Sequence, residues 1–206
     1  MVFNEDKNSI RKKILSIRET YRVSNEEIER IKEKFLSLVD KYKSNVILLY
    51  YPHRNEVDTK PIIRELLKRK KTVLLPKVEK NRILPIFISD ISDLKEGFAG
   101  IKEPEGKVYP KEKIDIVVVP AVAYDRKGYR LGYGKGFYDR FLKDFQNLKG
   151  KLCFKTKVRR NRFETQLIGL AYDFQVLDKL PHEKHDIPVD IIITPKEVIK
   201  TGRGNC

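Results

Sequence analysis

Residues 114–142 have the sequence IDIVVVPAVAYDRKGYRLGYGKGFYDRFL and combine an apolar run, a glycine-rich loop and a helical pattern. The run Ile114–Val119 is typical of a strand that is covered on both faces of a parallel sheet, and Pro120 closes it. Glycine stands at every second position from 132 to 136, and we expect a helix from about Gly136 to Phe145. A strand, a loop and a helix in this order are typical of α/β domains.

The sequence on both sides of this stretch continues the alternation of helices and strands. Apolar residues at helical spacing predict helices, and short β-branched runs predict strands. The predicted helices cover residues 6–20, 24–42 and 59–70, and the predicted strands cover residues 46–51, 72–75, 83–88, 167–172 and 190–194. This order favours a single domain over residues 1–206, an α/β/α three-layer sandwich with a mostly parallel, Rossmann-like central sheet.

Side chains near the ends of the helices indicate how the helices begin. Ser24 and Glu27 form the pattern of a capping box, and Thr59 stands where it can cap the next helix. In the first helix, the apolar residues at helical spacing are expected to face the core, and they are Ile10, Ile14 and Ile17.

Two prolines limit the predicted strands. Pro76 is expected to end the strand that begins at Thr72, because proline has no N–H to donate to a neighbouring strand. For the same reason Pro85 predicts that the strand at 83–88 lies at an edge of the sheet. The segment Gly97–Gly106 is expected to be a loop.

The charge of the chain is strongly positive. Its 206 residues include 44 Lys and Arg against 29 Asp and Glu, which gives a net charge of +15. Such an excess favours anionic ligands such as nucleotides or nucleic acid. A solvated surface rich in Lys and Glu, of the kind that accompanies thermal stability, explains the charge equally well.

The basic residues are densest in one segment, which we expect to form a loop over residues 151–164. Either it is a solvated loop, or it contacts a polyanionic ligand tail or nucleic acid. A short flexible tail is expected at the C-terminus. The basic residues of the segment are Lys151, Lys155, Lys157, Arg159, Arg160 and Arg162.

The sequence also indicates the compartment. Its two cysteines, Cys153 and Cys206, match neither a disulfide framework nor a zinc site. The charged start of the chain lacks the apolar core of a signal peptide, and no apolar run approaches the roughly 20 residues that span a bilayer. We therefore expect a cytoplasmic protein with no membrane partner.

The segment Arg130–Asp139, RLGYGKGFYD, has the composition of an anion site. Glycines let the backbone approach a ligand, and the amides of such a loop and of a helix start can bind phosphate. Arg130 and Lys135 add positive charge, and Asp139 lies in the first turn of the helix, where it can hold a metal ion. The segment matches neither Gly-x-x-x-x-Gly-Lys-Ser/Thr nor Gly-x-Gly-x-x-Gly, so its glycines alone do not identify the ligand.

Taken together, residues 119–142 resemble the 5-formyltetrahydrofolate cyclo-ligase family, also called 5,10-methenyltetrahydrofolate synthetases. The family pattern is a proline, a small apolar stretch, an aromatic-Asp pair, and then Gly-x-Arg-Leu-Gly-x-Gly-Lys-Gly-aromatic-Tyr-Asp. Further family motifs cover nearly the whole chain, and they are Lys7-x-x-x-Arg11, Glu56–Thr59, Gly100–Pro104, Gly169–Gln175 and His185–Asp190. Phe137 departs from the tyrosine that the family often has at that position.

The resemblance implies an activity: conversion of 5-formyltetrahydrofolate, with or without a polyglutamate tail, to 5,10-methenyltetrahydrofolate. ATP would phosphorylate the formyl oxygen, N10 would attack the activated carbon, and ADP and phosphate would be released. ATP would be the co-substrate and Mg²⁺ the metal ion. We expect a monomer, and we do not expect nucleic acid as a partner.

The resemblance also implies roles for individual residues. Catalytic roles fall on Arg130, Lys135 and Tyr138, and the metal ligands would be Asp139 and Asp186. The folate would contact Arg11, Tyr51, Glu56 and Tyr133. The residues expected to bind ATP are Lys7, Arg11, Arg130, Leu131, Gly132, Tyr133, Gly134, Lys135, Gly136, Phe137 and Tyr138.

Other interpretations of the same residues stay open from the sequence alone. Each charged residue in these motifs could be a surface charge, a helix cap or a turn residue. The predicted fold would also suit a sugar-phosphate isomerase or a relative of the CoA-transferases. A nucleic-acid-binding module would use the +15 charge, although no helix-turn-helix, zinc-finger or RNA-binding motif supports it.

Overall fold

The computed structural model describes residues 6–97, 100–143, 145 and 165–202. Its α-helices are α1 (Lys7–Thr20), α2 (Asn25–Lys41) and α3 (Lys60–Lys68), and residues 137–143 are also helical. Short 3-10 turns occur at Ile91–Asp93, Lys111–Lys113 and Asp173–Gln175. The cysteines, the predicted basic loop and the predicted flexible tail (residues 203–206) lie outside the described residues. Among the described residues, no helix has the length and apolar character needed to cross a bilayer.

Within the described ranges, seven strands form the central sheet, in the order β12-β11-β9-β6-β1-β2-β3. Its five inner strands run parallel, and β3 and β12 close the two edges in antiparallel orientation. The strands are β1 (Val46–Leu48), β2 (Thr72–Glu79), β3 (Arg82–Ile88), β6 (Ile116–Val119), β9 (Gln166–Leu170), β11 (Ile191–Ile193) and β12 (Val198–Lys200). The mostly parallel sheet predicted from the sequence is therefore confirmed.

The order of the parallel strands determines where a ligand is expected. Along the sheet they follow β2-β1-β6-β9-β11, so the first and third parallel strands of the chain lie side by side. This is the doubly wound order in which the chain reverses direction across the sheet between these two strands. The loops that follow the carboxyl ends of β1 and β6 diverge to opposite faces of the sheet. The crevice between these two loops is the usual ligand site of such folds.

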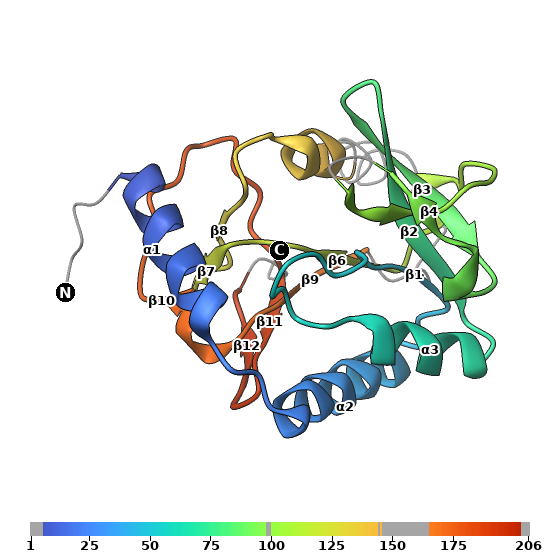
Figure 1. Cartoon of the computed structure of the whole chain (residues 1–206), viewed down its shortest axis with the longest axis horizontal. Helices are drawn as coiled ribbons and strands as arrows, with labels where there is room; N and C mark the ends of the chain where they lie inside the picture. The colour runs from blue at the N-terminus through green and yellow to red at the C-terminus, as the bar shows by residue number, and fades with distance from the viewer. Residues whose placement is uncertain (1–5, 98–99, 144, 146–164, 203–206) are drawn as a thin grey trace, which may run out of the picture.

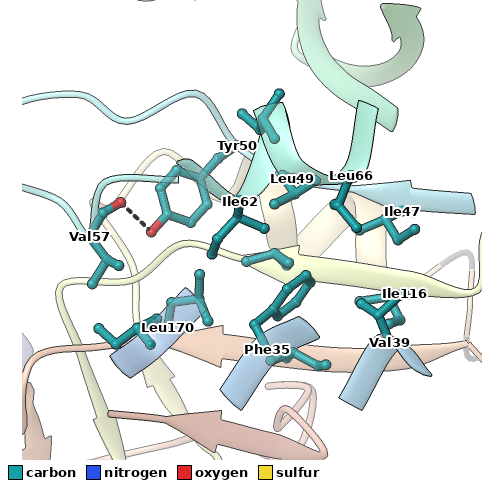
Figure 2. Packing of buried hydrophobic residues seen from close by; sticks show 14 of the residues in the cluster. Phe35, Val39, Ile47, Leu49, Tyr50, Val57, Ile62, Leu66, Ile116 and Leu170 are labelled. Atoms are coloured by element: carbon teal, nitrogen blue, oxygen red, sulfur yellow. Dashed lines mark hydrogen bonds between the residues drawn. The ribbon is translucent and has the colours of Figure 1, made fainter. Parts of the chain in front are cut away.

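Helices cover both faces of the sheet (Figure 1). On one face, α2 and α3 pack Phe35 and Leu66 against residues such as Ile47 and Ile116 (Figure 2). On the other face, the helical segment that begins at residue 137 buries its apolar side against the sheet; Leu142, for example, is fully buried. The three-layer prediction is confirmed.

Two smaller sheets complete the fold. Strands β10 (Val176–Leu177), β7 (Ala123–Asp125) and β8 (Arg130–Leu131) form one of them, and α1 packs against it. Strands β4 (Lys95–Glu96) and β5 (Lys102–Glu103) form the other, within and beside the segment that was predicted to be a loop. The sequence analysis missed these strands because each has only two or three residues, too few to show a period.

Helix α1 buries a different stripe from the one predicted. Ile10 and Ile14 are buried as expected. Ile17, however, is 38% exposed, whereas Arg18 is only 2% exposed. Residues at a spacing of four lie on one helix face, and this spacing continues from Ile14 to Arg18. The prediction of Ile17 as a core residue is therefore wrong.

The predicted caps have different outcomes. Ser24 and Glu27 form the capping box at the start of α2, as predicted. Thr59 precedes α3 but makes no side-chain cap. Its hydroxyl instead donates to the carbonyl of Tyr50 at 2.7 Å, which fixes the loop between β1 and α3.

Strand β2 continues past Pro76 to Glu79, contrary to the prediction. Pro76 lies opposite Pro85 in the register of β2 and β3. The carbonyl of Pro85 accepts from Tyr109 N at 2.8 Å, so this residue directs its backbone polar groups to the outer edge of the sheet. Neither missing N–H is therefore needed in the β2–β3 ladder. The prediction that β3 is an edge strand is confirmed.

Strand β1 ends at Leu48, three residues before the predicted end, because the chain leaves the sheet there to form the loop that carries Glu56. The other buried strands agree with the predictions to within about two residues, which is the usual uncertainty of such boundaries. The helix after the glycine-rich loop begins at Phe137 rather than at Gly136, whose φ of 67° is left-handed.

Candidate functional site

A pocket of about 320 Å³ lies beyond the carboxyl ends of β1 and β6, at the reversal point of the sheet. Three segments form most of its wall: the loop after β1, the end of β2 and the glycine-rich loop. The volume lies at the lower end of the roughly 300–1,000 Å³ typical of small-molecule pockets. The lining residues are Tyr50, Tyr51, His53, Arg54, Glu56, Pro76, Val78, Ile83, Ile101, Lys102, Glu103, Pro120, Arg130, Gly132, Tyr133, Gly134, Lys135, Gly136, Phe137, Tyr138 and Asp139.

The β7–β8 hairpin supports the glycine-rich loop. Its turn is held by the buried carboxylate of Asp125, which accepts from Lys127 N and Tyr129 N, each at 3.0 Å. The same carboxylate accepts from Leu180 N at 3.1 Å and so ties the hairpin to the C-terminal part of the chain. The aromatic-Asp pair of the family pattern thus ends in a residue that shapes the loop rather than one that lines the pocket.

The glycine-rich loop needs glycine at two positions. Gly134 and Gly136 have φ angles of 95° and 67°, a region that other residues rarely adopt. Between them, Lys135 is exposed and lines the pocket. The loop then enters the helix at Phe137, so that the first amides of the helix lie next to the pocket, as an anion site requires.

Arg130 and Asp139 form an ion pair at the wall of the pocket. The side chain of Arg130 is 5% exposed, whereas that of Asp139 is 40% exposed. The Nε atom of Arg130 and the hydroxyl of Tyr138 are buried, and neither has a hydrogen-bond partner among the described residues. Burial raises the pKa of Tyr138 well above its usual range, so this hydroxyl keeps its proton.

The loop after β1 holds Glu56 beside the pocket. Two hydrogen bonds anchor it: Tyr50 donates to the carbonyl of Val57 at 3.1 Å (Figure 2), and Thr59 donates to the carbonyl of Tyr50. Within the loop, Glu56 Oε2 accepts from His53 N at 2.9 Å. These contacts present the carboxylate as an acceptor directed toward the glycine-rich loop.

The hydroxyl of Tyr133 donates to Glu56 and links the two loops. Tyr133 is 43% exposed, and it lies between Gly132 and Gly134. Burial raises the pKa of Glu56, although its hydrogen bonds from Tyr133 and His53 and the charge of Arg18 act in the opposite direction. Tyr133 therefore belongs to the loop expected to bind ATP and also contacts the carboxylate expected to bind folate.

Helix α1 brings Lys7 and Arg11 to the same region. Arg11 Nε donates to the carbonyl of Gly132 at 2.9 Å. Lys7 Nζ lies 3.1 Å from Asp186 Oδ2 and 3.8 Å from Glu183 Oε1. The first helix is thus joined to the glycine-rich loop and to the segment before β11.

The pocket includes most but not all of the residues predicted for the site. Tyr51, Glu56, Arg130 and the residues from Gly132 to Asp139 line it, whereas Lys7, Arg11, Leu131 and Asp186 do not. Leu131 is 3% exposed in β8 and packs against α1. Its predicted contact with ATP would have to come through its backbone.

The two predicted metal ligands each engage a cation, Asp139 with Arg130 and Asp186 with Lys7. In the part of the chain that the structure describes, no group of three or more His, Cys, Asp or Glu side chains is arranged to hold a metal. Mg²⁺ commonly uses one or two carboxylates together with phosphate oxygens and water. The exposed carboxylate of Asp139 at the pocket fits that pattern.

Several pocket residues were not predicted as site residues. His53 and Arg54 belong to the loop of Glu56, and Lys102 and Glu103 come from β5. Glu103 is buried, and its Oε1 accepts from Val78 N at 3.1 Å, so it fixes β5 against the end of β2. The only signal for Lys102 and Glu103 was the motif Gly100–Pro104, whose residues had no assigned role.

Comparison with known proteins identifies relatives over most of the chain. The model of the "5-formyltetrahydrofolate cyclo-ligase family" matches residues 3–195. The 5-formyltetrahydrofolate cyclo-ligase of Escherichia coli K12 is 32% identical over 161 residues, which are 75% of this chain and 80% of that protein. The corresponding protein of Haemophilus influenzae is 33% identical over 172 residues, 80% of this chain and 84% of its own.

A solved structure shows the same fold. The NMR structure of Aquifex aeolicus 5,10-methenyltetrahydrofolate synthetase matches with a TM-score of 0.78 and 37% identity, over 97% of this chain and 95% of that chain. The family match, the identity of these relatives and the shared fold together support one conclusion. The chain belongs to the 5-formyltetrahydrofolate cyclo-ligase family.

Proposed function

We propose that the protein converts 5-formyltetrahydrofolate to 5,10-methenyltetrahydrofolate and consumes one ATP per turnover. The formyl oxygen attacks the γ-phosphorus of ATP, and ADP leaves. N10 then attacks the formyl carbon, whose oxygen now carries the phosphoryl group, and N10 loses its proton. The C–O bond breaks, and phosphate departs as the new ring closes. The observation that carries this proposal is the pocket at the reversal point of the sheet, which is lined both by the glycine-rich loop and by Glu56.

On the nucleotide side, the chemistry consists mainly of positioning and of offsetting charge on the transferred phosphoryl group. Backbone amides of the loop Gly132–Gly136 would bind phosphate oxygens, and Lys135 would offset their charge. Arg130 is already buried beside the pocket, so its charge is little screened by water. Lys7 and Arg11 would complete the ATP site from α1.

On the folate side, the carboxylate of Glu56 would accept N–H donors of the pterin ring, and Tyr51 would pack against that ring. Tyr133 contacts Glu56 and belongs to the glycine-rich loop, so it would touch both substrates. Tyr138 keeps its proton and can donate a hydrogen bond to the oxygen that receives the phosphoryl group. Bound Mg²⁺, held by Asp139 and Asp186, would supply positive charge to the phosphates.

The test uses the purified protein, 5-formyltetrahydrofolate and Mg-ATP, and it measures the absorbance of the methenyl product. We expect product only when ATP is present. Lys135→Ala should reduce kcat by about 100-fold or more, the usual cost of removing one group that stabilises transition-state charge. Lys127→Ala is the matched control, since Lys127 is exposed in the β7–β8 turn and does not line the pocket.

Absence of product from the folded wild-type protein over a range of temperature and pH would contradict the proposal. Near-normal turnover by Lys135→Ala would remove Lys135 from the mechanism. A dependence on ATP also separates this activity from that of a sugar-phosphate isomerase, which consumes none.

A further inference from the structure

Arg18 occupies a position where the pattern of α1 calls for an apolar residue. It follows Ile10 and Ile14 at a spacing of four, and it is 2% exposed. Its Nη1 atom is buried and has no hydrogen-bond partner among the described residues. Burial of an ion is costly unless other groups compensate it, so the groups that face this guanidinium decide what the position is for.

The neighbours of Arg18 belong to the two loops that form the pocket. Its guanidinium carbon lies 5.4 Å from the ring centre of Tyr133, within the range of a cation–π contact. The hydroxyl of the same tyrosine donates to Glu56. Asn55 Nδ2 donates to the carbonyls of Arg18 and Glu19, at 3.0 and 3.3 Å, which fastens the Glu56 loop to the last turn of α1.

The charge of Arg18 acts on Glu56. Burial raises the pKa of Glu56, while the hydroxyl of Tyr133, the backbone N–H of His53 and the positive charge of Arg18 lower it. The ring of His53 has a pKa lowered by burial and by two arginines, Arg54 and Arg18, so it is neutral at neutral pH.

The tyrosines near Glu56 stay neutral. The pKa values of the surrounding tyrosines are raised above their usual range, in each case mainly by burial, and these tyrosines are Tyr50, Tyr124, Tyr133 and Tyr138. The pocket that Glu56 lines also holds other charged side chains, and Arg18 is the arginine whose charge acts on Glu56. These other charged residues are Arg54, Lys102, Glu103, Arg130, Lys135 and Asp139.

We propose that Arg18 is a positioning residue for folate binding, whose buried guanidinium faces the ring of Tyr133 and places a positive charge beside the Glu56 carboxylate. This inference rests on the proposed function, in which Glu56 accepts N–H donors of the pterin. A protonated carboxyl would present a donor to those groups and would bind them poorly. When the N–H donors of the substrate bind at Glu56, Arg18 still offsets the negative charge of the carboxylate.

The experiment measures binding of 5-formyltetrahydrofolate by titration calorimetry without ATP, from about pH 5.5 to about pH 8.5. Arg18→Met removes the charge and keeps the length of the side chain. Its Kd should lie within about twofold of wild type at the alkaline end, where Glu56 is ionised in both proteins. The gap should widen as the pH falls, to about tenfold for each unit by which the pKa of Glu56 rises.

Three further variants separate this role from a structural one. Arg18→Lys retains the charge and should restore the pH dependence of the wild type. Arg22→Met removes an exposed arginine just beyond α1 and should leave both Kd and its pH dependence unchanged. If Arg18→Met does not fold, Arg18→Gln removes the same charge and retains hydrogen-bonding capacity.

The inference is overturned if a folded, charge-removing variant binds with the pH dependence of the wild type, whether its Kd is unchanged or is weaker by a constant factor. Wild-type protein that binds no 5-formyltetrahydrofolate at any pH would instead contradict the proposed function. The two failures are therefore distinguishable in one set of titrations.

Discussion

At the scale of single residues, Asp125 illustrates how a buried side chain can determine the shape of a site that it does not line. Its carboxylate accepts three backbone N–H bonds, from Lys127, Tyr129 and Leu180. Asp125→Asn would place an amide donor opposite at least one of these N–H groups. We expect a loss of about 1–3 kcal/mol in the free energy of unfolding, the usual cost of an unsatisfied buried polar group.

Chemical denaturation measures this loss. The control is Asp93→Asn, because Asp93 lies at an exposed position and, among the described residues, accepts a hydrogen bond from the hydroxyl of Ser89 alone. A change of less than about 0.5 kcal/mol is expected for the control, as for most surface substitutions. If the two substitutions lowered the free energy of unfolding equally, the three buried bonds of Asp125 would add no more to stability than one exposed bond does.

The sequence indicated the site residues that form continuous motifs, but it did not reveal Arg18. Successive residues on a helix differ by about 100° in direction, so positions 17 and 18 both lie near the border of the buried stripe. Hydrophobicity alone predicts that Ile17 is the buried residue, whereas in the structure Arg18 is buried and Ile17 is exposed. The groups near Arg18 include Tyr133 and Glu56, which are far away in the sequence and come near only after folding.

At the scale of elements, the capping box of α2 allows a direct measurement. The hydroxyl of Ser24 accepts from Glu27 N at 3.2 Å, and Glu27 Oε2 accepts from Ser24 N at 2.9 Å. Ser24→Ala should lower the free energy of unfolding by about 1 kcal/mol. Ser37→Ala, at an exposed position within the same helix, should be neutral or slightly stabilising because alanine favours the helix.

Thermal or chemical unfolding of the two variants side by side gives the comparison. If Ser37→Ala cost as much as Ser24→Ala, the loss would come from helix composition rather than from the cap. The helices were predictable because their period extends over many residues, and the buried strands were predictable because they are continuous apolar runs. The passage of β2 through Pro76 was not predictable, because it depends on the register with Pro85 in the next strand.

At the scale of the whole molecule, α1 is docked by polar contacts that reach the far end of the chain. Asp186→Asn would remove the ion pair with Lys7 but could still accept from Glu183 N, which donates to Asp186 at 2.9 Å. Because the pair is partly exposed, its loss should cost about 1 kcal/mol or less. Hydrogen exchange of the α1 amides should become several-fold faster, while exchange in α2 should be unchanged.

The control is Glu197→Gln, which breaks the ion pair between Arg126 and Glu197 without touching α1. It should leave exchange in α1 as it is in the wild type. Unchanged exchange of α1 in Asp186→Asn would mean that apolar contacts alone hold this helix in place. The three-layer architecture of the domain followed from the alternation of helices and strands. The contact between Lys7 and Asp186 did not follow, because a single charged residue shows no pattern in the sequence.

The pairing of Lys7 with Asp186 has a consequence for biosynthesis. The two residues are separated by 179 positions, so α1 leaves the ribosome long before its partner exists. The parallel sheet can begin to form from the N-terminal side, but the docking of α1 beside the glycine-rich loop cannot be completed until the segment that carries Asp186 has been made. Contacts of such high sequence separation form late and slowly. Ligand binding is therefore expected to be the last property that the nascent protein acquires.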